Sequence, residues 1–193
     1  MADTIIPRWE WRTFARQIEP RIDLAAQPKT RHAVSSEIYL VCETSDDNPK
    51  IRDDKMDIKH LQRIDADGLE QWRPVMKADF PLSADQLREV YRTLELGTPR
   101  EEGATIGMEA FLALLGGDRR VRAVRVDKVR DLFDVGGCIV EAADVSFDGD
   151  AYQTLAVEDP DPKRVIDTIA ALGFSGRDNL NYVRAIRTLA GTR

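Results

Sequence analysis

Polar and apolar residues alternate with a period of two in the stretch RWEWRTF, at residues 8–14. Two arginines and Glu10 fall on one side of this stretch, and two tryptophans fall on the other. An extended strand alternates its faces in this way. Since one face of a strand is usually apolar and buried while the other is polar and wet, the stretch raises the question of which face lies inside the fold.

The same alternation, bounded by turn residues, predicts further strands along the chain. Turn sequences occur at 46–49 (DDNP), at Gly136–Gly137 and at Asp148–Gly149, and the last two are expected to be hairpin turns. The additional strand candidates are residues 36–43, 49–53, 55–61, 70–79, 119–134, 137–148 and 151–158.

Apolar residues at helical spacing predict four helices between and after these strands. The first begins at Ser83, which has the capping-box spacing with Gln86. The other three cover about 108–115, 162–172 and 182–190, and the segment RIDLAAQPKTRH at 21–32 is interpreted as a linker or a short surface helix. The order of strands, helices, strands and helices predicts a mostly antiparallel α+β fold, in a single domain over residues 1–193.

Composition is typical of a soluble globular protein, with 42% hydrophobic and 32% charged residues in a chain of 193. No apolar run approaches the roughly 20 residues of a membrane helix, and the N-terminus lacks the apolar core of a signal peptide. Cys42 and Cys138 are therefore expected to be reduced thiols in a cytoplasmic protein, with a disulfide between them as the alternative. The net charge of −6 argues against general nucleic-acid binding.

The 28 lysines and arginines are concentrated at alternate positions of the predicted strands. For any single strand, a wet outer face explains this pattern. The combination over many strands favours a closed barrel of about eight strands, with charges lining its interior and helices packed outside. Arg8, Glu10 and Arg12 would then face inward, while Trp9 and Trp11 would lie outside beneath a helix. Because closely spaced cations repel one another, such an interior implies a polyanionic ligand, and carboxylates among the cations imply a bridging Mg²⁺.

Seven short motifs occur in a fixed order along these strands: RWEWR, EIYLV, KIR, MDIK, DKVR, IVEAADVSFDG and LAVE. Together they resemble the CYTH superfamily, also called triphosphate tunnel metalloenzymes, over residues 8–187. The resemblance implies an eight-stranded antiparallel tunnel, basic residues that hold a tri- or polyphosphate, and acidic residues that hold a divalent metal. The family signature E-x-E-x-K is altered here, because Arg8 replaces its first Glu and Arg12 its Lys. Ala156 likewise replaces a Glu of the late E-x-E motif.

The resemblance and the strand pattern together predict the site residues. Mg²⁺ or Mn²⁺ would be held by Glu10, Glu141 and Glu158, with Asp144 as a further candidate, and catalysis would involve Glu10, Glu158 and Lys128. Arginine suits a phosphate ligand because its planar fork binds two oxygens at once. The predicted substrate-binding cations are Arg8, Arg12, Lys50, Arg52, Lys59, Lys77, Arg120, Arg122, Lys128 and Arg130.

The predicted function is metal-assisted hydrolysis of a phosphoanhydride in a small polyanion, either a triphosphate, a polyphosphate or a nucleotide. Two alternatives stay open. The tunnel could bind such an anion without cleaving it, which the two altered carboxylate positions favour. The chain could also be an interaction scaffold whose charges all face solvent. Neither nucleic acid nor a membrane is expected as a partner.

Overall fold

The structure, a computed structural model, describes residues 7–99 and 105–190. Within these ranges the strands are β1 (Trp9–Ala15), β2 (Lys29–Cys42), β3 (Asn48–Arg52), β4 (Lys55–Ile64), β5 (Glu70–Asp79), β6 (Val121–Val135), β7 (Cys138–Phe147) and β8 (Asp150–Asp159). The helices are η1 (Leu24–Ala26), which is a 3₁₀ helix, and α1 (Ala84–Thr93), α2 (Met108–Gly116), α3 (Pro162–Leu172) and α4 (Tyr182–Leu189).

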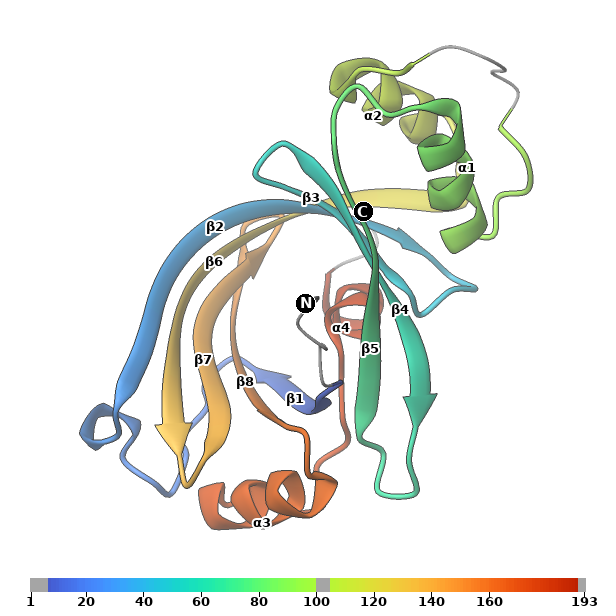
Figure 1. The fold of residues 1–193 in the computed structure, drawn as a ribbon. Coiled ribbons are helices and arrows are strands. Elements are labelled where there is room, and N and C mark those ends of the chain that lie inside the picture. The colour runs from blue at the N-terminus through green and yellow to red at the C-terminus, as the bar shows by residue number, and fades with distance from the viewer. Residues whose placement is uncertain (1–6, 100–104, 191–193) are drawn as a thin grey trace, which may run out of the picture. The chain divides into compact units, whose positions relative to one another are not determined.

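The eight strands form a closed barrel in the order β1-β5-β4-β3-β2-β6-β7-β8 (Figure 1). The pairs β1–β5, β1–β8, β2–β3, β3–β4 and β7–β8 are antiparallel. Closure gives each of these eight strands a neighbouring strand on both sides, which protects strand edges from pairing with other chains. The predicted α+β fold with an eight-stranded antiparallel barrel is confirmed, and it is the fold that the resemblance to the CYTH superfamily implies.

The start of β2 was predicted incorrectly. The strand begins at Lys29 rather than at residue 36, so part of the segment interpreted as a linker or surface helix is extended. Residues 29–32 are all exposed, which removes the apolar alternation that marks a half-buried strand. The helical part of that segment is only the single turn η1, where the Asp23 carboxylate accepts a hydrogen bond from the Ala25 amide.

The chain divides into two compact units, which we describe separately. The first consists of Met1–Ser35, Gln62–Arg73 and Asp127–Asn181. In this unit α3 packs against β1, β7 and β8 (Figure 1). Trp9 and Trp11 are buried with Val165, Ile169 and Leu172 of that helix. The prediction that the two indoles lie beneath a helix is therefore confirmed.

The segment before α4 completes the hydrogen bonding of β1 in the same unit. β1 pairs with β8 over seven residues but with β5 only at Trp9 and Glu10. Beyond that point the Asn179 side chain accepts a hydrogen bond from the Arg12 amide at 2.9 Å and donates one to the Glu10 carbonyl at 3.0 Å. The Leu180 amide donates a hydrogen bond to the Arg12 carbonyl at 2.8 Å. Asn179 and Leu180 thereby supply backbone partners that β5 does not.

The second unit consists of Ser36–Leu61, Pro74–Val126 and Tyr182–Arg193. Here α1 begins with the predicted capping box between Ser83 and Gln86, and α1 and α2 lie side by side (Figure 1). They bury Leu87 and Phe111 against Met56 of β4 in one apolar cluster. An amphipathic helix is stabilised mainly by burial of this kind, since short isolated helices are marginal in water.

Both cysteines are buried free thiols, as the sequence predicted. Burial raises the pKa of the Cys138 thiol, against the opposing effect of the Thr168 hydroxyl that donates to it. Of the helices in residues 7–99 and 105–190, none has the length and apolar character needed to cross a bilayer.

Candidate anion site

The register of β1, β8 and β7 places charged side chains on one face of the first unit. Arg12 is opposite Ala156, and Ala156 is opposite Glu141. Directly opposed residues in an antiparallel sheet share a face, so these three side chains form one row across the strands. Trp11 and Val157 project to the other face, where they pack beneath α3. The charged face is consequently the interior face, as predicted.

Arg12 lies at the centre of this face and is only 5% exposed. Its Nε donates to Glu10 Oε1 at 3.0 Å, and its Nη1 donates to Glu141 Oε1 at 2.8 Å and to Thr154 Oγ1 at 3.3 Å. The guanidinium thus bridges β1 and β7 across β8. Ala156, which lies between Arg12 and Glu141 in register, contributes only a methyl group and leaves the space through which the guanidinium reaches Glu141.

Three cations converge on Glu141. Arg12 and Arg130 both donate to its carboxylate, Arg130 through Nη1 at 3.4 Å, and Lys128 lies close enough to act on its charge. Burial alone would raise the pKa of Glu141, but the Arg12 guanidinium, followed by Arg130 and Lys128, outweighs it and lowers the pKa to about 2. Glu141 is therefore ionised at neutral pH. We call Glu10, Arg12, Lys128, Arg130 and Glu141 the Arg12 group.

One donor in the Arg12 group has no acceptor. Arg130 Nε is buried and makes no hydrogen bond with the part of the chain that the structure describes. A buried donor without a partner costs about 1–3 kcal/mol, more when it belongs to a charged group. Lys128, which is 3% exposed, lies on the same face of β6 two residues away. An oxygen-rich anion beside Arg130 would satisfy this donor.

Arg8 and Glu158 form an ion pair at the more exposed end of the same face. Arg8 Nη1 lies 3.7 Å from Glu158 Oε2, and the Arg8 side chain is 51% exposed. Pairs of this kind contribute about 1 kcal/mol or less. Both residues belong to the predicted site and share its face, but Arg8 is mostly in solvent.

The second unit has its own set of charges on β2, β3 and β4, comprising Glu37, Tyr39, Lys50, Arg52 and Asp57; we call this the Lys50 group. Lys50 is opposite Tyr39 on one side and Asp57 on the other. Its Nζ lies 3.1 Å from Glu37 Oε2, and Arg52 Nη2 lies 2.8 Å from Asp57 Oδ2. Burial lowers the pKa of Lys50, against the opposing effect of Glu37. Lys59, half-buried on β4, also acts on Lys50.

Besides Arg8 and Lys59, three more of the predicted binding cations belong to neither group. Lys77 is exposed on β5. Arg120 is exposed and pairs with Asp118 at 2.6 Å. Arg122 donates to the Ile186 carbonyl at 2.8 Å and to the Ala190 carbonyl at 3.1 Å, at the C-terminal end of α4. A cation at this end of a helix satisfies carbonyl groups that have no partner within the helix, so Arg122 stabilises α4.

Several interior residues were missed by the sequence analysis. Glu37 has the strand parity of Tyr39, so the alternation rule could have found it. Glu70 is opposite Glu10 and is held by the Asn181 amide at 3.1 and 3.3 Å. Thr154 carries no charge, and its role follows only from its contact with Arg12.

The carboxylates predicted to bind a metal do not fit a resident divalent ion. Glu10 and Glu141 are both bonded to Arg12, and Glu158 is paired with Arg8. Asp144 is exposed and accepts a hydrogen bond from Gln153. Within residues 7–99 and 105–190, no three His, Cys, Asp or Glu side chains lie together in a way that could hold a metal ion. Mg²⁺ and Mn²⁺ prefer several oxygen ligands, and here arginines already occupy those oxygens.

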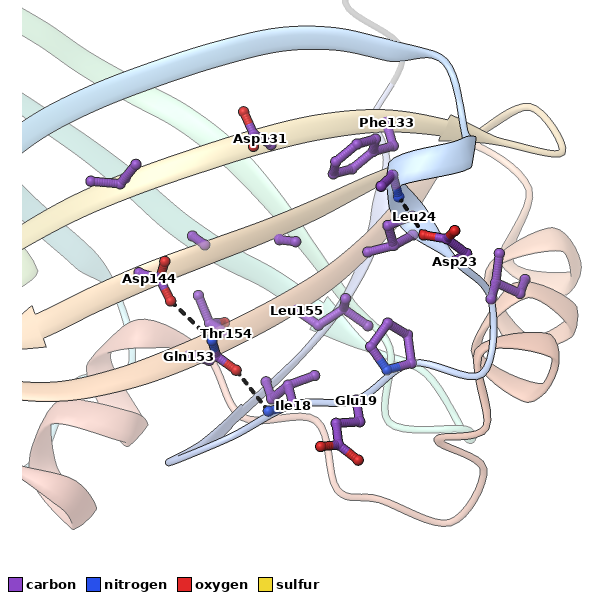
Figure 2. A pocket seen from close by; sticks show the side chains of 16 residues that line it. Ile18, Glu19, Asp23, Leu24, Asp131, Phe133, Asp144, Gln153, Thr154 and Leu155 are labelled. Carbon is purple, nitrogen blue, oxygen red and sulfur yellow. Dashed lines mark hydrogen bonds between the residues drawn. The ribbon is translucent and has the colours of Figure 1, made fainter.

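A separate cavity of about 510 Å³ lies in the first unit, between β6–β8 and the segment around η1 (Figure 2). Its lining includes four acids, Glu19, Asp23, Asp131 and Asp144, and none of the predicted cations. Figure 2 shows Asp131 and Asp144 on neighbouring strands along its edge. An acidic lining repels phosphate, so this cavity is not the candidate anion site.

Comparison with known proteins found no matching family model and no matching curated protein. Among solved structures, an adenylyl cyclase candidate from Hippeastrum, described as having a dominant triphosphatase activity, is 11% identical with a TM-score of 0.49, over 94% of this chain and 95% of that chain. A conserved hypothetical protein from Pyrococcus furiosus is 14% identical with a TM-score of 0.47, over 91% and 98%. A protein from Pyrococcus horikoshii is 12% identical with a TM-score of 0.46, over 89% and 93%. At these values the likeness carries no argument, and the fold rests on the strand order.

Proposed function

We propose that the Arg12 group binds the phosphate chain of a small polyanion, either an inorganic tri- or polyphosphate or the triphosphate of a nucleotide. The observation that carries this proposal is Arg130 Nε, a buried charged donor that has no acceptor among residues 7–99 and 105–190. It lies beside the buried cations Arg12 and Lys128. Arginine and lysine together suit a phosphate chain, because guanidinium groups bind oxygens in pairs while an ammonium group adapts to a single oxygen.

The burial of the Arg12 group strengthens its attraction for a phosphate chain. A charge–charge contact is worth several times more near a desolvated protein surface than in bulk water. Side chains already held by Glu10, Glu141 and Thr154 also lose less rotamer freedom when a ligand binds. A phosphate chain would complete the coordination of Arg130 without leaving either carboxylate unpaired.

The test is calorimetric titration with sodium tripolyphosphate, beside sodium sulfate at equal ionic strength. We expect saturable binding of tripolyphosphate that Arg130→Gln and Lys128→Gln weaken. The matched controls are Arg73→Gln and Lys77→Gln, which remove exposed cations from β5 and should leave the affinity unchanged. Equal heats from tripolyphosphate and sulfate would contradict the proposal and favour a scaffold with solvated charges.

Hydrolysis of a phosphoanhydride, the activity that the resemblance implies, stays a prediction. Phosphate release from tripolyphosphate, measured on the same samples with Mg²⁺ and then with Mn²⁺, tests it. Release that disappears in Glu10→Gln would support hydrolysis. Binding without release would identify a binding module.

A further inference from the structure

We propose that Arg12 takes the position of a divalent cation in this barrel, so that the site holds its anion without a metal ion. The identity of the anion rests on the proposed function. The inference that the site holds no metal ion is independent of which anion binds. The inference about metal depends on three observations: the contacts of the Arg12 guanidinium, the small side chain of Ala156 between Arg12 and Glu141, and the charges around Glu141.

The contacts of Arg12 join carboxylates from two strands, as a bridging metal would. Its Nε and Nη1 lie 3.0 and 2.8 Å from oxygens of Glu10 and Glu141. Both contacts are charge-assisted, and the guanidinium is almost completely buried. A metal ion could bind these oxygens only by displacing the guanidinium, which would leave a buried cation without its acidic partners. Such a loss is strongly destabilising.

The small side chain of Ala156 makes this bridge feasible. Ala156 is opposite both Arg12 and Glu141, on the strand between them, and is fully buried. A carboxylate at this position would lie directly between the guanidinium and Glu141. The alanine therefore removes an oxygen ligand and, at the same time, opens the path for the arginine.

The surrounding charges also disfavour a divalent ion. Arg130 and Lys128 act on Glu141 together with Arg12. A doubly charged ion placed at this carboxylate would be repelled by all three. A phosphate chain has the opposite sign and is attracted by the same three side chains, so the site suits an anion without a metal.

The first experiment titrates the wild-type protein with Mn²⁺ in a phosphate-free buffer. We expect no saturable binding at millimolar Mn²⁺. In a second measurement, the rise in melting temperature caused by tripolyphosphate should be the same in EDTA as in buffer that contains Mg²⁺. Saturable Mn²⁺ binding by the wild type, or loss of the tripolyphosphate effect in EDTA with recovery in excess Mg²⁺, would overturn the inference. Absence of any tripolyphosphate effect would refute the proposed function instead, and the Mn²⁺ titration would still decide the inference about metal.

The second experiment tests the role of Arg12 directly. Arg12→Gln removes the positive charge between Glu10 and Glu141, so we expect this variant to bind Mn²⁺ roughly tenfold or more tightly than the wild type. Arg16→Gln is the matched control, because Arg16 is exposed, its Nη1 donates to the Ala151 carbonyl, and its guanidinium lies over the Tyr152 ring. No gain of Mn²⁺ affinity in folded Arg12→Gln would count against the inference. If that variant does not fold, Ala156→Glu supplies a third carboxylate and should gain Mn²⁺ affinity over the wild type, while equal affinities would overturn the proposal.

Discussion

The Arg12 group and the Lys50 group use similar side chains in different arrangements. In the Lys50 group each cation has its own acid, since Lys50 pairs with Glu37 and Arg52 pairs with Asp57. In the Arg12 group three cations converge on Glu141, and one buried donor of Arg130 has no acceptor in the described part of the chain. One-to-one pairing gives each cation of the Lys50 group an acidic partner within the protein. In the Arg12 group, cations outnumber the acid on which they converge, so they can also bind an anionic ligand. This difference is the basis for our proposal that the Arg12 group binds the ligand, whereas the Lys50 group mainly stabilises the barrel.

The largest expected effect is on stability, in the Lys50 group. Glu37→Gln leaves Lys50 buried without its charged partner, which should lower the free energy of unfolding by about 3–5 kcal/mol. Urea denaturation measures this change. Exposed Glu43→Gln is the control and should be neutral within about 0.5 kcal/mol. Adding Lys50→Met to Glu37→Gln should recover most of the loss, and a double variant as unstable as the single one would contradict a paired structural role.

A pH dependence distinguishes the Arg12 group. The pKa of Glu141 is lowered from 4.5 to about 2. A carboxyl group with a depressed pKa stabilises the folded state above its ordinary pKa, and that contribution disappears as the pH falls through the folded-state value. We expect Glu141 to account for about 3 kcal/mol of the stability lost between about pH 5 and about pH 2.

Urea denaturation at stepped pH, with wild type beside Glu141→Gln, measures this contribution. The variant should lose less stability over that interval, and exposed Glu109→Gln should follow the wild type. Parallel pH profiles for wild type and Glu141→Gln would show that the carboxylate is not held by the three cations.

The next effect in size is on affinity. Arg130→Gln should weaken tripolyphosphate binding by roughly tenfold or more, because hydrogen bonds to charged groups contribute about 1.5–3 kcal/mol. Arg52→Gln, in the Lys50 group, should weaken it less. Calorimetric titration of both variants with tripolyphosphate measures how much each group contributes to the affinity. Equal losses would assign the ligand to both.

The smallest effect is expected at the exposed end of the charged face. Arg8→Ala removes a solvent-exposed partner of Glu158 and should change the free energy of unfolding by about 1 kcal/mol or less. Denaturation in low and high salt checks this value, since screening should abolish what remains of it. A loss above that range would show that the pair is more constrained than its exposure indicates.

The barrel could be predicted because its determinants are local. Alternation identified all eight strands, and the Ser83–Gln86 spacing placed α1. The beginning of β2 was missed because its exposed residues carry no apolar period. Local patterns also identify which face of a strand is charged, because side chains at even and odd positions project to opposite faces.

The contacts within the site could not be predicted, because they join residues that are far apart in the sequence. Arg12 and Glu141 are 129 positions apart, and their bridge depends on the size of Ala156 on a third strand. Alternation likewise assigned Arg122 to the site, although its partners are carbonyl groups at the end of α4. Residue type and alternation along a strand show which face of the strand is charged. The partner of each charged side chain depends on how distant parts of the chain pack together.

The pairing of β1 has a consequence for how the protein is made. This strand precedes the other strands of the barrel in the chain, but its main partner is the last of them, β8, and Asn179 and Leu180 hold more of its backbone groups. Because domains are synthesised from the N-terminus, the tryptophans of β1 stay uncovered until β8 and α3 have been made. Ribosome-bound chains that end before β8 should therefore expose an aromatic segment that chaperones can bind, and those that extend past residue 181 should not.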